Sequence, residues 1–264
     1  MVTALTIAGS DSSGGAGIQA DLKTFAAHGV FGLSAITSIT AQNTEGVVAM
    51  ESVSPELVTA QIDAVVSDLG PSATKIGMLA NSAVVAAVAG AIESHALQYV
   101  VLDPVMVATS GQRLLDESGI DLLRSRLLPL ASVVTPNLSE AEVLTGLQVR
   151  TLSGMRSAAV RLVELGARVA IVTGGHLDGP AVDVLYDGER CVELSGERIT
   201  SRHTHGTGCT FSSAIAARLA LGDPAVDAAR SAKIYVTRAI QEAPGLGRGR
   251  GPLGHFPPAN TRKS

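Results

Sequence analysis

Polar side chains that could bind a metal or move a proton follow two short apolar runs. Asp103 comes directly after the run 99–102, and Asn137 and Glu140 follow the run 132–134. A carboxylate at the end of a buried strand can bind Mg²⁺ or accept a proton. The simpler interpretation of Asp103 is an aspartate that stabilises a turn. Asn137 and Glu140 share one face of a first helical turn, where they could bind Mg²⁺ or cap the helix. The sequence does not decide between turn and ligand for Asp103, or between helix cap and Mg²⁺ ligand for Asn137 and Glu140.

A second kind of chemistry is indicated by Thr-His-Gly-Thr-Gly-Cys-Thr at residues 204–210, which leads into a helical pattern. Glycines at a helix start let backbone N–H groups converge at the positive end of the dipole, which suits a phosphoryl group in transfer. Cys209 at this position should have its thiolate favoured, with its pKa lowered by about a unit or more. The alternative is a small core residue. We interpret His203 and His205 as loop residues.

Two further glycine-rich segments follow apolar runs. Residues 9–17 read Gly-Ser-Asp-Ser-Ser-Gly-Gly-Ala-Gly, and residues 172–176 read Val-Thr-Gly-Gly-His. Neither matches a Walker loop or a Gly-x-Gly-x-x-Gly fingerprint. Each could be a ligand-binding loop or a glycine turn, and the local sequence does not separate these readings.

Composition limits the classes of protein to consider. The chain has 264 residues, of which 46% are apolar and 17% charged, with a net charge of −4. This balance is typical of a globular protein with a large core. Lys and Arg are scattered rather than gathered in a basic stripe, which argues against nucleic-acid binding. We find no signal peptide and no run near the roughly 20 apolar residues of a membrane span. We therefore expect a cytoplasmic protein without a membrane partner.

Apolar runs alternate with helical patterns almost from end to end, which predicts βαβ units and a mostly parallel sheet with helices on both faces. Asp187-Gly188-Glu189 predicts a hairpin between strands at 182–186 and 190–194, and the chain should close with helices over about 210–221 and 225–241. Ligands of such sheets bind at the carboxyl ends of the strands. We expect one domain over 1–264, with its core at about 3–256 and a flexible C-terminal tail.

Taken together, the motifs closely resemble those of the bifunctional hydroxymethylpyrimidine/phosphomethylpyrimidine kinases of thiamine biosynthesis. The resemblance runs in register from about residue 4 to 256 and covers the segments 5–24, 40–44, 75–79, 103–106, 135–140, 205–210 and 251–256. That family belongs to the ribokinase-like superfamily, whose members have a three-layer α/β/α fold, usually dimerise and use MgATP. The resemblance therefore implies an ATP- and Mg²⁺-dependent kinase, a homodimer, that phosphorylates the pyrimidine and then its monophosphate.

The resemblance also assigns roles to individual positions. The pyrimidine site would be lined by Gly9, Asp21, Gln42 and Met78. The anion hole would be formed by Gly206, Thr207, Gly208 and Cys209, with Cys209 as the base where most of the superfamily has Asp. Asp103 and Glu140 would hold Mg²⁺, and Asn137, Thr173 and Lys233 would lie at the nucleotide.

One position departs from the pattern, because many relatives carry lysine where this chain has Thr173. Losing that ammonium removes a phosphate contact worth about 1–3 kcal/mol, so either another cation substitutes or the second phosphorylation is weakened. The alternatives are a pyridoxal kinase of the same superfamily and a pyrimidine-binding protein that lost catalysis. An interaction scaffold has no supporting feature in the sequence.

Overall fold

A single nine-stranded sheet organises the molecule. The computed structural model describes residues 1–108, 111–175, 177 and 179–256, so His176 and the predicted C-terminal tail lie outside the described residues. The strand order is β3-β2-β1-β4-β5-β6-β7-β8-β9. The strands are β1 (Thr3–Asp11), β2 (Phe31–Asn43), β3 (Gly46–Ser52), β4 (Ala73–Ile76), β5 (Val100–Leu102), β6 (Val133–Val134), β7 (Ala170–Val172), β8 (Ala181–Tyr186) and β9 (Cys191–Gly196).

The strands from β2 through β1, β4, β5 and β6 to β7 are parallel, while β3, β8 and β9 join antiparallel at the two edges. The helices are α1 (Gly17–Ala27), α2 (Pro55–Leu69), α3 (Ser82–His95), α4 (Glu117–Leu122), α5 (Leu138–Thr145), α6 (Leu152–Glu164), α7 (Thr207–Ala220) and α8 (Ala225–Gln241). Short π and 3₁₀ turns, Leu123–Leu127 and Leu128–Leu130, extend α4.

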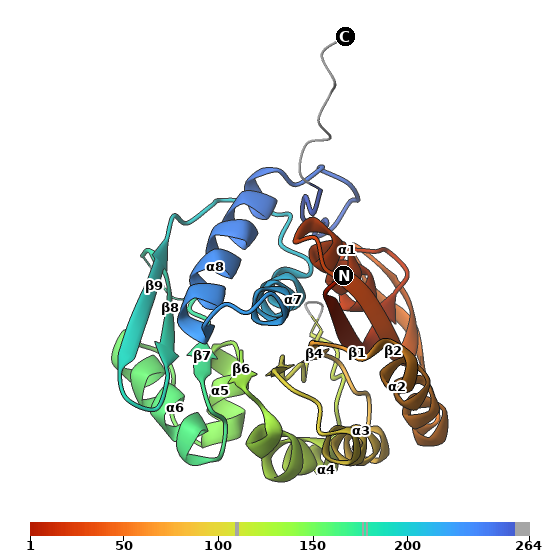
Figure 1. The fold of residues 1–264 in the computed structure, drawn as a ribbon. Coiled ribbons are helices and arrows are strands. Elements are labelled where there is room, and N and C mark those ends of the chain that lie inside the picture. Colours follow the sequence, from red (N-terminus) through yellow and green to blue (C-terminus); the bar gives the residue numbers. More distant parts are fainter. Residues whose placement is uncertain (109–110, 176, 178, 257–264) are drawn as a thin grey trace.

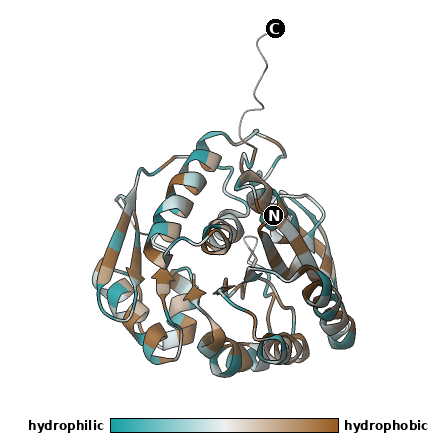
Figure 2. Cartoon of the chain, in the orientation of Figure 1, coloured by the Kyte–Doolittle hydropathy of each residue, from teal (hydrophilic) through white to brown (hydrophobic). Residues whose placement is uncertain are grey.

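Helices cover both faces of the sheet. In Figure 1, α1, α7 and α8 lie on one face, and α2, α3, α4 and α6 lie on the other. Each face has its own apolar core, one built with α1, α7 and α8 and one with α2 to α6. The hydropathy colouring shows the central strands as mostly hydrophobic (Figure 2). The predicted three-layer α/β/α fold with a mostly parallel sheet is confirmed.

Local sequence signals explain several element boundaries. Ser54 caps α2 by accepting a hydrogen bond from Leu57 N, and Pro55 occupies the first helical turn, where its missing N–H costs nothing. The predicted hairpin is formed by β8 and β9. The helix predicted over about 210–221 begins earlier, at Thr207. Residues 46–52, which the sequence analysis did not assign, form the edge strand β3 against β2.

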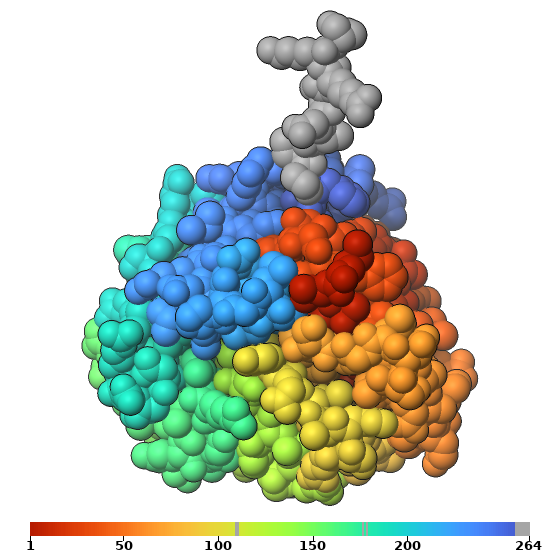
Figure 3. All heavy atoms as spheres, in the orientation of Figure 1, coloured from red at the N-terminus to blue at the C-terminus, as the bar shows by residue number. Residues whose placement is uncertain are grey.

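The two halves of the sequence meet at one face of the molecule. In the space-filling view the red N-terminal segment borders the blue C-terminal part of the described chain (Figure 3). The contact is extensive, since α1 packs on α7 and α7 on β1. Among the described residues, helices that are both long and apolar enough to cross a membrane are not found.

Candidate active site

Two glycine-rich loops meet at the carboxyl edge of the sheet. His205 is buried, and its Nε2 lies 2.8 Å from Asp11 Oδ2. Asp11 also accepts backbone hydrogen bonds from Ser13 N and Ala16 N, each at 2.8 Å. Gly206 has a φ of 82°, and a side chain there would overlap the carbonyl oxygen of Gly15. The sequence analysis missed the role of His205, because its partner lies in a loop at the other end of the chain.

The first turn of α7 exposes backbone donors. Thr207 N donates to Thr204 O at 3.3 Å, and Thr210 N donates to Gly206 O at 2.8 Å. Within the described part of the chain, the N–H groups of Gly208 and Cys209 have no protein acceptor. These donors lie at the positive end of a 14-residue helix, which favours an anion. A Cβ placed on Gly208 would be 3.8 Å from Asp103 Oδ2, so the predicted anion hole and Asp103 lie side by side.

The protonation state of Cys209 differs from the prediction. Cys209 is half-buried, and its removal from water together with the charges of Asp103 and Asp21 raises the pKa of its thiol to about 12, although the charge of Lys75 opposes this. The expected lowering of this pKa by the helix start is therefore wrong. The helix dipole acts on Cys209, but burial beside carboxylates outweighs it.

A buried polar network lies beneath Cys209. Lys75 has no exposed surface, and its Nζ lies 3.0 Å from both carboxylate oxygens of Asp21. Asp21 also accepts hydrogen bonds from Thr6 and Ser213, each at 2.6 Å. Asp21, predicted to line the pyrimidine site, is therefore fully buried. Its carboxylate is already occupied by protein donors.

Lys75 also faces Asp103, with 4.0 Å between Nζ and Oδ2, and Ser212 donates to the same carboxylate at 3.2 Å. Burial alone would lower the pKa of Lys75, but Asp21, Cys209 and Asp103 outweigh it and raise the pKa, so the ammonium stays charged. The sequence analysis included Lys75 only in the segment 75–79, which contributes to the family resemblance. A lysine inside an apolar strand was the signal that could have indicated a buried partner.

Asn137 and Glu140 form a capping box at the start of α5. Asn137 Oδ1 accepts from Glu140 N at 3.0 Å, and Glu140 Oε2 accepts from Asn137 N at 2.9 Å. The capping interpretation is thus confirmed for both residues. Burial, together with the charge of Asp103, raises the pKa of Glu140 to about 8.

The surroundings of Asp103 and Glu140 also fit Mg²⁺. The two buried carboxylates repel each other, and Lys75 is shared with Asp21. Added positive charge would relieve that repulsion, and Mg²⁺ is commonly held by one or two carboxylates together with substrate phosphates. Groups of three or more His, Cys, Asp or Glu side chains arranged for a metal are not found in the described residues.

Two of the residues predicted for the pyrimidine site lie in contact. A Cβ on Gly9 would lie 2.6 Å from Met78 Cε, so a side chain there would require Met78 to move. Gln42 is half-buried, and its Nε2 lies 3.2 Å from His205 Nε2. Gln42 and His205 line a cavity of about 340 Å³. The structure thus brings Gln42 to the loop that starts the anion hole.

Residues predicted for the nucleotide gather along the ends of β6 and β7. Thr173 N donates to Pro136 O at 2.9 Å, which places Thr173 beside Asn137. Lys233 on α8 pairs with Asp183 at 2.7 Å. Asp183 Oδ1 also accepts from Gly174 N at 2.9 Å, so Lys233 is linked to the glycine turn after β7.

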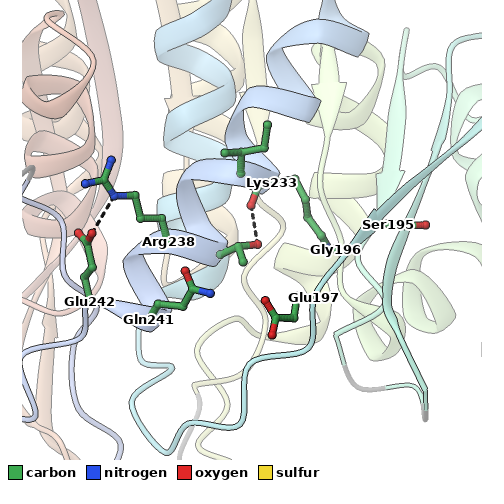
Figure 4. Close-up of a pocket in the computed structure, with 9 residues that line it drawn as sticks. Ser195, Gly196, Glu197, Lys233, Arg238, Gln241 and Glu242 are labelled. Carbon is green, nitrogen blue, oxygen red and sulfur yellow. Dashed lines mark hydrogen bonds and ion pairs between the residues drawn. The ribbon is translucent and has the colours of Figure 1, made fainter.

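Lys233 also lines a cavity of about 470 Å³ between α8 and the end of β9. Figure 4 shows Ser195, Gly196 and Glu197 on one side of this cavity and α8 on the other, with Arg238 paired to Glu242.

The chain matches known proteins over nearly its whole length. Residues 11–254 match the family model described as phosphomethylpyrimidine kinase. The hydroxymethylpyrimidine/phosphomethylpyrimidine kinase of Rhizobium meliloti is 53% identical, with 96% of each chain covered. The thiamine biosynthesis bifunctional protein ThiED of Geobacter sulfurreducens is 50% identical over 96% of this chain, which spans only 52% of that relative's length.

Among solved structures, an ADP complex of Bacillus subtilis pyridoxal kinase is similar, with a TM-score of 0.91 and 42% identity over 97% of each chain. The chain is a kinase and belongs to the phosphomethylpyrimidine kinase family.

Proposed function

We propose that this kinase transfers the γ-phosphoryl group of ATP to the hydroxymethyl group of 4-amino-5-hydroxymethyl-2-methylpyrimidine, and then to the resulting monophosphate. The observation that carries this proposal is the pair of open N–H groups at Gly208 and Cys209 beside Asp103. Such donors stabilise the charge on a phosphoryl group in transfer, where positioning and electrostatics supply most of the rate. The name of the Rhizobium meliloti relative supports the pyrimidine as substrate.

Cys209 is the proposed proton acceptor. The substrate hydroxyl loses its proton to the Cys209 thiolate as its oxygen bonds to phosphorus and ADP leaves. A pKa of about 12 makes the thiolate a strong base that is scarce at neutral pH. Lys75 is the one neighbour that lowers this pKa through its charge, so it increases the fraction of thiolate.

The remaining groups bind and orient the reactants. Asp103 and Glu140 would hold Mg²⁺, which when bound neutralises charge on the phosphates. The nucleotide would lie near Thr173 and Lys233, and the similar pyridoxal kinase structure shows that a relative of this fold binds ADP. Because Lys233 is already paired with Asp183, it does not replace the missing ammonium at Thr173. Turnover of the monophosphate is therefore expected to be weaker than that of the free pyrimidine.

A pyridoxal kinase is the second candidate, favoured by the similarity to the Bacillus subtilis enzyme. Both substrates carry a hydroxymethyl group on a nitrogen heterocycle. The ring that fits is decided by the space between Gly9, Gln42 and Met78. The homodimer and the cytoplasmic location stay predictions.

The test is an ADP-release assay with MgATP, offering the pyrimidine, its monophosphate and pyridoxal. Wild type is compared with Cys209→Ala and with Cys191→Ala, a control at an exposed cysteine. Turnover of the pyrimidines that collapses only in Cys209→Ala supports the proposal. Turnover of pyridoxal alone supports the second candidate. Turnover that persists in Cys209→Ala removes Cys209 as the base.

A further inference from the structure

The cavity beside Gln42 is closed by a late segment of the chain. Its wall includes Arg250 together with the connection between β2 and β3. Arg250 N donates to Thr44 O at 2.9 Å, and Gly249 N donates to Thr44 Oγ1 at 3.2 Å. His205 N donates to Gly251 O at 3.1 Å. Residues 249–251 therefore join the wall of the cavity to the loop that begins the anion hole.

The charges around this cavity do not cancel. Glu45, the only acidic residue of the wall, is paired with Arg248 at 3.0 Å. His205 is paired with Asp11. Within the part of the chain that the structure describes, the Arg250 guanidinium has neither an acidic partner nor a hydrogen-bond acceptor. The wall therefore carries one uncompensated positive charge, which favours an anionic ligand.

We propose that Arg250 binds the phosphate group of the monophosphate substrate and so determines how well the enzyme carries out the second phosphorylation. This inference rests on the proposed function. The hydroxymethyl substrate is neutral and offers the guanidinium no charged partner, whereas the monophosphate is an anion that guanidinium binds with charge-assisted, bidentate hydrogen bonds. The alternative is that Arg250 is a solvated surface arginine that contacts neither substrate, and the experiment must exclude it.

The position of Arg250 suits this role. It is followed by Gly251, which accepts from the backbone of His205, and His205 is followed by Gly206 at the start of α7. A phosphate in this cavity would thus lie beside His205, which precedes the predicted anion hole, with Gly249 and Arg250 in the wall.

The experiment compares Arg250→Ala, Arg250→Lys and a control, Arg190→Ala, which removes an exposed arginine near the β8–β9 turn. For each protein, kcat and KM are measured for the pyrimidine and for its monophosphate, and binding of the monophosphate is measured by calorimetry without ATP. We expect Arg250→Ala to raise KM and the calorimetric Kd for the monophosphate about 10- to 100-fold, and to change KM for the pyrimidine less than about threefold.

Arg250→Lys should give an intermediate value, because it keeps the charge but loses the bidentate geometry, and Arg190→Ala should match wild type. Equal losses for both substrates, or an unchanged Kd for the monophosphate, would overturn the role of Arg250. Wild type that turns over neither pyrimidine would overturn the proposed function instead. In that case the calorimetric comparison alone still decides whether Arg250 binds the phosphomonoester.

Discussion

His205 Nε2 and Asp11 Oδ2 lie 2.8 Å apart, although 194 positions separate the two residues in the sequence. The pair joins the loop after β1 to the loop that starts α7. Asp11 in turn orders its own loop by accepting from Ser13 N and Ala16 N. A single carboxylate thereby fixes two loops on which the candidate active site depends.

Asp11→Asn tests this link. Burial alone would raise the pKa of Asp11, but hydrogen bonds from His205 and Ser13 outweigh it and hold the pKa below its usual value. A depressed pKa contributes stability above the unfolded-state pKa, and that stability is lost as the pH falls through the folded-state value. We expect Asn to cost about 1–3 kcal/mol at pH 7 and progressively less below about pH 4. Urea unfolding at both pH values measures this, and a pH-independent difference would contradict it.

Cys209 should react slowly with alkylating reagents at neutral pH, because its pKa of about 12 leaves little thiolate. Iodoacetamide at pH 7.5, followed by peptide mass spectrometry, should modify the exposed Cys191 first. If Cys209 is the base, kcat should rise with pH from 7 to 9, approaching tenfold per unit where proton transfer limits the rate. A flat pH profile together with rapid alkylation of Cys209 would show that the thiol is not held protonated.

Glu140→Gln should separate stability from activity. Burial raises the pKa of Glu140 to about 8, so the folded protein binds more protons than the unfolded chain between about pH 4.5 and 8. Wild-type stability therefore falls as the pH rises through this window. Gln keeps the capping box and removes the charge, so the variant should be more stable than wild type at pH 8, on the order of 2 kcal/mol, and much less active. Denaturant unfolding of both proteins at pH 5 and pH 8 measures the difference in their free energies of unfolding. A variant less stable than wild type at pH 8 would contradict it.

Lys75→Met should be strongly destabilising, by about 3–5 kcal/mol, because it leaves Asp21 buried without its counter-charge. The double variant Asp21→Asn/Lys75→Met removes both charges and should recover much of this loss. If the two single effects simply add in the double variant, the pair is not coupled. Urea unfolding of wild type, the two single variants and the double variant gives the four free energies of unfolding that this comparison needs.

Much of the fold could be predicted from the sequence, because its signals are local. Apolar runs alternating with helical patterns predicted the parallel sheet covered on both faces. Asp187-Gly188-Glu189 predicted the hairpin of β8 and β9, and the local pair Ser54 and Pro55 explains the start of α2. The position of chemistry-bearing residues after strands also follows from local order, since parallel strands bring their carboxyl ends to one edge.

What these residues do at that edge was decided by partners far away in the chain. The type of residue and its spacing identified Cys209 at a helix start, but the pKa of its thiol depends on burial and on Asp103, Asp21 and Lys75, which come from β5, α1 and β4. Asp21 was predicted to line the pyrimidine site, and the structure pairs it with Lys75, 54 positions away. Sequence determines which groups are available, whereas electrostatic energy depends on distance and burial, and only the tertiary structure sets those.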